Sequence, residues 1–327
     1  MARQTRRYNI SPYQPSLFTD DELDAPTLRA LDPEKVKPAV GTVKFMSFGS
    51  GSSGNCAFLT DGYTGLLIDA GVDPEHVERS LTHHGFSMDM VRGVLLTHDH
   101  SDHVRFVYKL VRGYKHIRVY CTPKAFNGIM RRHSISRRLK DYFEAVYKEH
   151  PFKIGAWDIT LFDVSHDGTD NAGFFITNGP HTICIATDLG TVTDRVRFYM
   201  QHARNIVLES NYDLEMLRRG PYPEFLKSRI AADRGHLDNV DSARFVTELM
   251  AAHPSMLQRV FLCHLSHDNN TPQKALSCIT DAVEAAFPGT VIIADDTTLY
   301  ASDSDPRHLM LNALPRFEAS PLYTFYL

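Results

Sequence analysis

The pattern of apolar and polar positions along the chain changes after residue 40. Residues 1–40 are polar, contain five prolines and show no clear period, so we interpret them as an N-terminal extension or arm. The next apolar runs, "TVKFMSF" and "AFLTDGYTGLLIDAG", predict strands, with the Asp-Gly pair at 61–62 as a hairpin turn. "DPEHVERSLTHHGF" then predicts a helix that Asp73 opens and Gly85 closes.

Strands and helices continue to alternate along the rest of the chain. "VRGVLLT" predicts a buried strand, "HVRFVYKLVRGY" a helix, "IRVYCT" a strand and "PKAFNGIMRRHSISRRLK" a basic, mostly helical stretch. Further strands are predicted in "WDITLFDVS", "GFFITNG", "HTICIATD", "RNIVLES", "RVFLCHLS" and "TVIIAD", and helices in "DNVDSARFVTELMAAH" and "TPQKALSCITDAVEAAF". Two strand-rich halves with interspersed helices predict an α/β fold of two packed sheets with helices outside. We expect one catalytic domain over 41–300, and a C-terminal segment, 301–327, that packs on it or trails from it.

Composition narrows the class of protein. The chain has 327 residues, of which 43% are hydrophobic, enough for a sizeable core. Its net charge of −4 does not indicate a nucleic-acid binder, although a local basic patch is enough to bind phosphates. The five cysteines are scattered and form no CxxC pair, which favours a reducing compartment. No apolar leader or membrane span is visible. We therefore expect a cytoplasmic protein without membrane contact.

The stretch "LLTHDHSDHV" crowds three histidines and two aspartates directly after a buried strand. His98 and His100 are two positions apart in an extended chain, so they point the same way and can share one metal. Asp102 and His103 lie where the next helix begins and can face a second metal. A cluster of imidazoles and carboxylates suits Zn²⁺, and also Mn²⁺ or Fe²⁺. A solvated loop is the alternative interpretation, but such a loop rarely gathers four groups of this kind.

Two metal sites need more ligands than one loop offers. His166, Asp188 and His264 each follow a predicted strand. With them, the predicted ligands of one metal are His98, His100 and His166, and those of the other are Asp102, His103 and His264. Asp188 would bridge the two. Two divalent ions in such a centre activate a water for hydrolysis, so no serine or cysteine nucleophile is required.

The stretch "GSGSSG", residues 49–54, matches the glycine pattern of dinucleotide-binding proteins. A strand follows it instead of the helix that this fold requires, and the lysine of a phosphate-binding P-loop is missing. We therefore predict no nucleotide cofactor. The stretch is better interpreted as a tight turn whose backbone NH groups face a cleft and contact a substrate phosphate. Its candidate substrate-binding residues are Ser52, Ser53 and Asn55.

The complete T-H-x-H-x-D-H motif and the order of the later ligands resemble the metallo-β-lactamase superfamily over residues 43–300. The resemblance implies a four-layer αβ/βα sandwich, a di-metal centre and hydrolytic activity. In the phosphodiesterase branch of that superfamily, a Glu–His pair lies beside the metals. The resemblance implies that Glu209 orients His236 as a general acid, so the predicted catalytic residues are Asp102, His236 and Glu209. A histidine in a helix-capping loop is the alternative for His236.

Longer stretches resemble one subfamily. "SFGSGSSGNC", "LIDAGV", "LLTHDHSDH", "ESNYDLEMLRRGPYPEFLKSRI", "GHLDN" and "CHLSHDNN" are similar to the YycJ/WalJ-type exonucleases of bacteria. The resemblance implies a 5′-to-3′ DNA exonuclease and a setting in DNA repair or in cell-wall stress signalling. Asp238 stands where that group usually has Ser, and His267-Asp268 where it commonly has Lys-Glu. The roughly 75 residues between Asp188 and His264 leave no room for the capping domain of β-CASP RNA nucleases.

A basic stretch over 131–140 supplies candidates for contact with a phosphate backbone, although a solvated helix face is an equal alternative. The substrate-binding candidates outside the glycine-rich turn are Arg131, Arg132, Arg137, Arg138 and Asn211. A small-molecule or RNA phosphodiesterase on the same metal site is the alternative enzyme. The Glu–His pair and the basic stretch argue against a thioester hydrolase. The complete ligand set argues against a non-catalytic metal-binding regulatory protein.

Overall fold

The computed structural model describes residues 42–254, 256–293 and 308–325. The chain divides into two compact units, residues 1–38 and 39–327, and the second is described here. The predicted extension over 1–40 lies outside the described residues. Within the described residues, no helix is long and apolar enough to cross a membrane.

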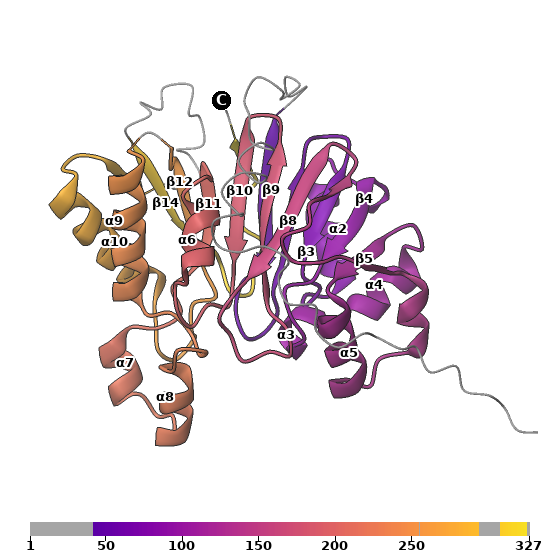
Figure 1. The fold of residues 1–327 in the computed structure, drawn as a ribbon, viewed down its shortest axis with the longest axis horizontal. Coiled ribbons are helices and arrows are strands. Elements are labelled where there is room, and N and C mark those ends of the chain that lie inside the picture. The colour runs from indigo at the N-terminus through magenta and orange to yellow at the C-terminus, as the bar shows by residue number, and fades with distance from the viewer. Residues whose placement is uncertain (1–41, 255, 294–307, 326–327) are drawn as a thin grey trace, which may run out of the picture. The chain divides into compact units, whose positions relative to one another are not determined.

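The first sheet has seven strands in the order β15-β1-β2-β3-β4-β5-β6. Figure 1 labels β3, β4 and β5 of this sheet. They are β1 (Val43–Gly49), β2 (Cys56–Thr60), β3 (Gly65–Ile68), β4 (Val91–Leu95), β5 (Arg118–Cys121), β6 (Phe143–Ala145) and β15 (Tyr323–Phe325). Neighbours from β15 to β3 pair antiparallel, and those from β3 to β6 pair parallel. The chain connects the parallel pairs by helical crossovers, which parallel strands require.

The second sheet has eight strands in the order β13-β14-β12-β11-β10-β9-β8-β7. They are β7 (Phe152–Ile154), β8 (Trp157–Asp163), β9 (Ala172–Asn178), β10 (His181–Ala186), β11 (Asn205–Glu209), β12 (Arg259–Cys263), β13 (Val291–Ile293) and β14 (Leu309–Ala313). Neighbours from β7 to β10 pair antiparallel, and those from β10 to β13 pair parallel.

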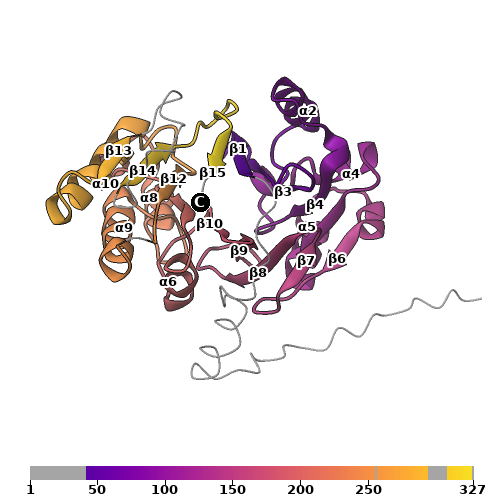
Figure 2. The same ribbon diagram turned by 90° about the horizontal axis from the view of Figure 1, so that it is seen from above.

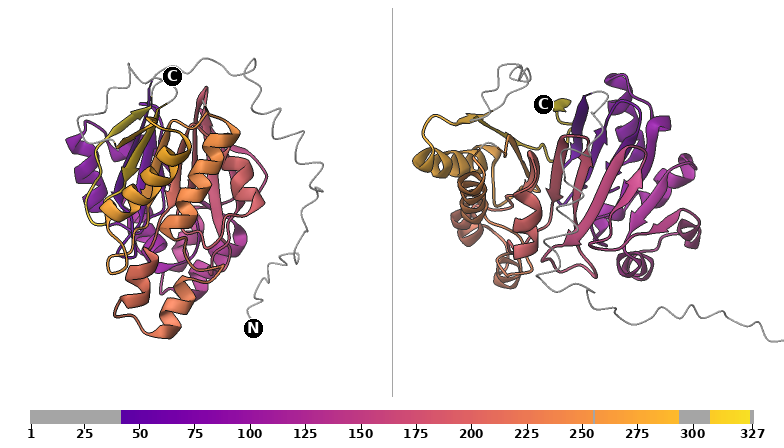
Figure 3. Two further views of the ribbon diagram at one scale, coloured as in Figure 1. Left: turned by 90° about the vertical axis from the view of Figure 1, so that its left-hand side faces the viewer. Right: turned by 45° about the horizontal axis from the view of Figure 1, so that its top comes forward.

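Helices cover the outer face of each sheet, which confirms the prediction of two packed sheets with helices outside (Figure 2). The first sheet carries α2 (Pro74–His83), α4 (Val107–Gly113) and α5 (Pro123–Arg132), and the second α6 (Asp194–Met200), α9 (Asn239–Ala252) and α10 (Pro272–Ala286). Figure 3 shows α9 and α10 side by side on the second sheet. The remaining helices are α3 (Ser101–Val104), α7 (Leu214–Arg219) and α8 (Glu224–Ile230), with short 3₁₀ turns at Met88–Met90 and Arg137–Asp141.

The apolar core follows from the alternation of side chains along each strand. In β4, Val94 packs beneath the helices of the first sheet, whereas Leu95 belongs to the core between the two sheets. That inner core also holds Phe45, Phe174 and Phe261, all of them fully buried. Because both faces of the central strands are covered, these strands are apolar nearly throughout, and polar residues occur at their ends.

The structure differs from the sequence prediction in several places, and helices α6, α7 and α8 are among the elements that were not predicted. The expected helix after the histidine-rich loop is divided into α3 and α4, because the amide of Phe106 donates to the carbonyl of Ala70 (2.9 Å) and leaves the helical ladder. β6 and β7 were not predicted, since three residues are too few to show a period. β14 and β15 belong to the two sheets, although the sequence analysis set residues 301–327 apart from the catalytic domain.

Candidate metal centre

Four of the predicted ligands come together as a first group. His98, His100, His166 and Asp188 offer atoms that all lie within 4.8 Å of one another. The two histidines of the β4–α3 loop meet His166, which follows β8, and Asp188, which follows β10. Oδ2 of Asp188 lies 3.1 Å from Nε2 of His98 and 3.7 Å from Nε2 of His166. Nδ1 of His100 lies 3.3 Å from Nε2 of His166.

The second predicted set forms a neighbouring group. Asp102, His103 and His264 also offer atoms within 4.8 Å of one another. Oδ2 of Asp102 lies 3.5 Å from Nε2 of His103 and 3.7 Å from Nε2 of His264. Asp188 reaches this group too, with Oδ2 3.0 Å from Nε2 of His103 and Oδ1 2.9 Å from Nδ1 of His264. Asp188 therefore lies between the two groups, where the sequence analysis placed a bridging ligand.

Unsatisfied atoms show that these residues fit a metal. Among the described residues, Nε2 of His98, Nε2 of His264 and Oδ1 of Asp188 are buried and form no hydrogen bond, although each lies near another candidate ligand atom. Burying such an atom unpaired costs about 1–3 kcal/mol, so native structures rarely leave several together. Imidazole nitrogens and carboxylate oxygens are ligands that Zn²⁺, Mn²⁺ and Fe²⁺ accept. The donor set is therefore suited to divalent cations.

Outer contacts fix the orientation of two of the histidines. Nδ1 of His103 lies 2.7 Å from Oδ2 of Asp69, whose carboxylate also accepts from the amide and hydroxyl of Thr97 (2.8 and 2.9 Å). Nδ1 of His166 lies 2.9 Å from the carbonyl of Gly235. Both bonds place a proton on Nδ1 and leave Nε2 free for a metal. Asp69 was not predicted as a site residue, although a carboxylate at the end of an apolar strand was a signal for it.

The electrostatics of the two groups differ. Burial lowers the pKa of His98 and His100, and it lowers the pKa of His166 to about 4, so these rings are neutral. Burial also opposes the charged form of His264, but the charge of Asp188 beside it raises its pKa overall. A divalent cation at this position would supply the positive charge in place of that proton.

Both carboxylates of the site are ionised. Burial alone would raise the pKa of Asp102, but the charge of His103 beside it lowers the pKa well below its usual range. Burial likewise acts against ionised Asp188, and the charges of His264 and His103 outweigh it, so the pKa of Asp188 is lowered. Ionised carboxylates among imidazoles are the charge state that metal binding requires.

Glu209 and His236 form the predicted pair beside the second group. Oε1 of Glu209 lies 2.8 Å from Nδ1 of His236 and 2.7 Å from Nδ1 of His264. Oε2 accepts from the amides of Leu189 and Leu237 (2.7 and 3.2 Å), so the carboxylate is held in place. Glu209 is fully buried, whereas the side chain of His236 keeps 21% exposure. Burial raises the pKa of Glu209, but the charge of His236 lowers it overall, so the carboxylate is ionised.

The structure argues against substrate contact for two of the predicted residues. Asn55 is buried, and Nδ2 lies 3.2 Å from Oδ2 of Asp102 and 2.9 Å from Nε2 of His103. Asn211 is buried as well, and its Nδ2 donates to the carbonyl of His264 (2.6 Å). Both amides thus hold ligand residues in place. Ser52 and Ser53 of the same turn as Asn55 are exposed, and a strand follows the turn as predicted.

The predicted basic residues lie on the surface, at the end of α5 and in the 3₁₀ turn Arg137–Asp141 that follows it. Arg131, Arg137 and Arg138 are exposed. Arg132 is engaged instead, because its Nε lies 3.3 Å from Oδ2 of Asp99, a fully buried carboxylate between His98 and His100. Asp99 also accepts from the amide of Thr169 (2.9 Å), and its carbonyl lies 2.6 Å from Nε2 of His133. Asp99, which the sequence analysis missed, therefore fastens the basic stretch to the metal-ligand loop.

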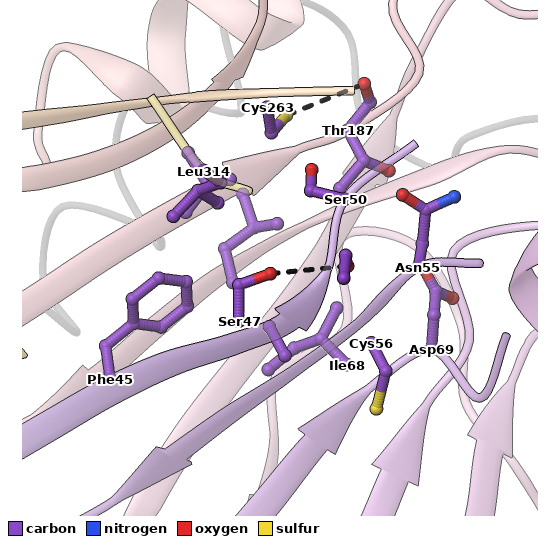
Figure 4. A pocket seen from close by; sticks show the side chains of 14 residues that line it. Phe45, Ser47, Ser50, Asn55, Cys56, Ile68, Asp69, Thr187, Cys263 and Leu314 are labelled. Carbon is purple, nitrogen blue, oxygen red and sulfur yellow. Dashed lines mark hydrogen bonds between the residues drawn. The ribbon is translucent and has the colours of Figure 1, made fainter. Parts of the chain in front are cut away.

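A small cavity is lined by residues of both sheets (Figure 4). Its lining includes Ser50, Asn55, Asp69 and Thr187, and its volume is about 20 Å³. This volume suits one water molecule, so the cavity is no substrate pocket. The hydroxyl of Thr187 has no hydrogen-bond partner among the described residues, and a water in the cavity would supply one.

Comparisons with known proteins agree with this geometry. Residues 64–264 match a family described as beta-lactamase superfamily domain. The chain is 32% identical to exodeoxyribonuclease YycJ of Bacillus anthracis, over 73% of this chain and 89% of the relative. It is 31% identical to exodeoxyribonuclease WalJ of Streptococcus pneumoniae, over 80% of this chain and 95% of the relative. The structure is also similar to the crystal structure of the metallo-β-lactamase fold protein YhfI from Bacillus subtilis. The superposition includes 87% of this chain and 100% of YhfI, with a TM-score of 0.59 at 15% identity.

Proposed function

The chain belongs to the metallo-β-lactamase superfamily and is a metal-dependent hydrolase with that fold, and from this premise we propose that it is an exonuclease that degrades DNA from 5′ ends. The observation that carries the proposal is the Glu209–His236 pair beside Asp188 and His264, because a proton donor at this place serves the cleavage of a phosphodiester. The exodeoxyribonuclease names of two relatives, matched over most of their length, support the choice of DNA.

In the proposed mechanism, each ligand group has a chemical task. Two divalent cations, held by the two ligand groups with Asp188 between them, would supply Lewis-acid chemistry that polarises a phosphoryl group and makes water nucleophilic near neutral pH. Glu209 accepts a hydrogen bond from Nδ1 of His236, which directs the other ring nitrogen away from the carboxylate. As the P–O bond breaks, protonated His236 gives its proton to the leaving oxygen. Positioned proton transfer of this kind contributes about 10²- to 10⁴-fold to rates.

The exposed arginines of the basic stretch would bind the DNA backbone. Arg131, Arg137 and Arg138 stand free of ion pairs among the described residues, and Arg132 of the same stretch contacts the histidine-rich loop through Asp99. We predict that Arg137→Gln with Arg138→Gln raises the KM for DNA and reduces the salt dependence of binding by roughly 0.7 to 0.9 per lost phosphate contact. Arg218→Gln with Arg219→Gln on α7, where both residues pair with Glu215, is the matched control. An unchanged salt slope would remove the basic stretch from the interface.

The direct test uses DNA labelled at one 5′ end or one 3′ end, incubated with the purified protein and Zn²⁺ or Mn²⁺. We expect release of mononucleotides from the 5′ end that depends on the metal and is lost in Asp102→Ala. Circular dichroism and the unfolding temperature of Asp102→Ala show whether that variant is folded. Protein that binds metal but leaves DNA intact contradicts the proposal, and parallel RNA and small phosphodiester substrates then test the alternative enzymes.

The proposed setting is DNA repair in the cytoplasm. All five cysteines are free, and burial raises the pKa of Cys56, Cys121, Cys184 and Cys263, which keeps these thiols protonated and inert. Free, unreactive thiols suit a reducing compartment.

A further inference from the structure

Two exposed rings lie beside the metal centre without a role in the chemistry described above. The side chain of His267 is 69% exposed, and Phe317 is 61% exposed. Their ring centroids are 6.2 Å apart, with an angle of 63° between the planes. His267 follows the ligand His264 by three residues, whereas Phe317 comes from the connection between β14 and β15. Two distant parts of the chain thus present aromatic surface at one place.

Arg316 fastens this place to the ligand loop. Its Nε donates to the carbonyl of Leu265 (2.7 Å), and its Nη2 donates to the carbonyls of Ser266 and Asn270, the latter at 3.0 Å. The glycine-rich turn lies against the same residues, since a Cβ on Gly51 would meet Arg316 Cγ at 3.6 Å and the Leu265 carbonyl at 3.7 Å. Phe317 therefore lies next to the segment that carries His264.

The ring of His267 is held in position while its surface stays open. Nδ1 of His267 lies 2.8 Å from Oδ1 of Asp268, and the hydroxyl of Tyr222 donates to Oδ2 of the same carboxylate (2.7 Å). The ring therefore has a fixed orientation before any ligand arrives. A preorganised surface loses less conformational entropy when it binds.

We infer that the ring of Phe317, with the ring of His267 set edge-on beside it, forms a stacking platform for a base of the nucleic-acid strand whose phosphodiester reaches the metal centre. The inference rests on the proposed nuclease function and adds a base-binding site to it. A nucleic-acid strand alternates bases with phosphates, so a base platform needs phosphate-binding groups beside it. Ser52 and Ser53 are exposed on the neighbouring glycine-rich turn. Arg105 supplies a cation there, because its Nη1 donates to the carbonyl of Ser53 (3.4 Å). Two rings among polar neighbours offer a surface of the size of one base, smaller than a protein interface needs.

The test compares Phe317→Ala with wild type on oligodeoxynucleotides in which a single abasic position is moved inward from the end. Loss of one stacked base should raise the KM roughly 5- to 100-fold and leave kcat nearly unchanged. When the abasic position faces the platform, the KM of wild type should rise by the same factor. On that oligonucleotide, Phe317→Ala should have the same KM as wild type. Phe317→Tyr should restore binding, and hydrolysis of methyl p-nitrophenyl phosphate, which has no base, should be unchanged in both variants.

Tyr63→Ala is the matched control. Tyr63 is 74% exposed on the turn between β2 and β3, at the opposite end of the sheet from the loop that follows β4. Two outcomes overturn the platform alone, provided that the wild-type protein cleaves DNA. In the first, Phe317→Ala has the KM of wild type. In the second, the KM of Phe317→Ala is raised equally at every abasic position. Wild-type protein that hydrolyses the small diester but no oligonucleotide overturns the proposed function and the platform together.

Discussion

At the scale of single residues, the carboxylate of Asp188 faces both ligand groups. One oxygen lies near His98 and His103, and the other lies 2.9 Å from Nδ1 of His264. The side chain is 3% exposed, so its charge is poorly solvated and needs positive partners nearby. An amide of the same shape would keep the packing but would replace one acceptor oxygen by an NH₂ donor. Substitution of Asp188 by Asn therefore tests the effect of its charge on the site while the shape of the side chain is kept.

We predict that Asp188→Asn lowers both the metal content of the purified protein and its hydrolytic rate, the latter by at least about 100-fold, because a bridging ligand matters more than an outer contact does. Elemental analysis by mass spectrometry measures the metal. The control is Asp158→Asn, a half-exposed carboxylate paired with Lys153 on the surface. Full metal content in Asp188→Asn would show that Asp188 is no ligand.

Glu209 and His236 should act as one unit. We predict that Glu209→Gln lowers kcat roughly 10- to 100-fold, since the amide can no longer orient and stabilise protonated His236. The double variant with His236→Ala should be no slower than His236→Ala alone, because the two residues contribute through the same proton. Glu209 also contacts His264, so the metal content of each variant is measured alongside. Additive losses at full metal content would contradict the pairing.

At the scale of elements, the sequence predicted what local pattern determines. Long apolar strands such as β8 and helices such as α2 were predicted close to their observed positions. In α2 the predicted cap is confirmed, because the side chain of Asp73 accepts from the amide of Glu75 (2.9 Å). The candidate ligands could be named because they lie in a histidine-rich loop after one apolar strand or directly follow another. Asp69 was missed although it too follows an apolar strand, whereas Asp99 and Arg316 could not be assigned, since their partners lie in loops that meet only in the folded chain. The short strands β6, β7 and β15 depend on sheet neighbours in the same way.

Helix α2 offers a test of pH dependence. Lys109 donates to both oxygens of Asp73 (2.9 Å each), and this hydrogen bonding lowers the pKa of Asp73. The stabilisation is therefore present above the ordinary pKa near 4 and is lost as pH falls through the lower pKa of the folded state. We predict that Asp73→Asn, which keeps the cap, loses at most about 0.5 kcal/mol at pH 7, and that Asp73→Ala loses about 1 kcal/mol. Urea unfolding at several pH values measures this, and a difference between wild type and Asp73→Asn that persists in strong acid would contradict it.

At the scale of the whole second unit, the C-terminal segment joins both sheets. Phe325 of β15 pairs with Val43 of β1, and its ring lies 6.2 Å from that of Phe261 in the second sheet. β14 lies between β12 and β13. The connection between β14 and β15 also carries Arg316 and Phe317 to the metal centre. The same segment thus closes the sandwich and completes the surface around the site.

We predict that Phe325→Ala lowers the free energy of unfolding by roughly 3 kcal/mol, because it leaves a cavity between the sheets. Phe325 is 4% exposed, whereas Tyr63 is 74% exposed, so Tyr63→Ala should stay within about 0.5 kcal/mol of wild type. Denaturant unfolding measures both. Equal effects of the two substitutions would show that β15 adds little to the closure of the sandwich.

The pairing of β1 with β15 also has a consequence for synthesis. β1 leaves the ribosome roughly 15 to 60 seconds before its partner strand, at ordinary rates of translation. Until then the outer edge of β1 offers unpaired amides and carbonyls to any other extended chain. A truncated chain that ends before residue 323 would leave this edge of β1 permanently unpaired. Chaperones that shield nascent chains should therefore matter more for the yield of this enzyme than for that of proteins whose first strand pairs with its next neighbours alone.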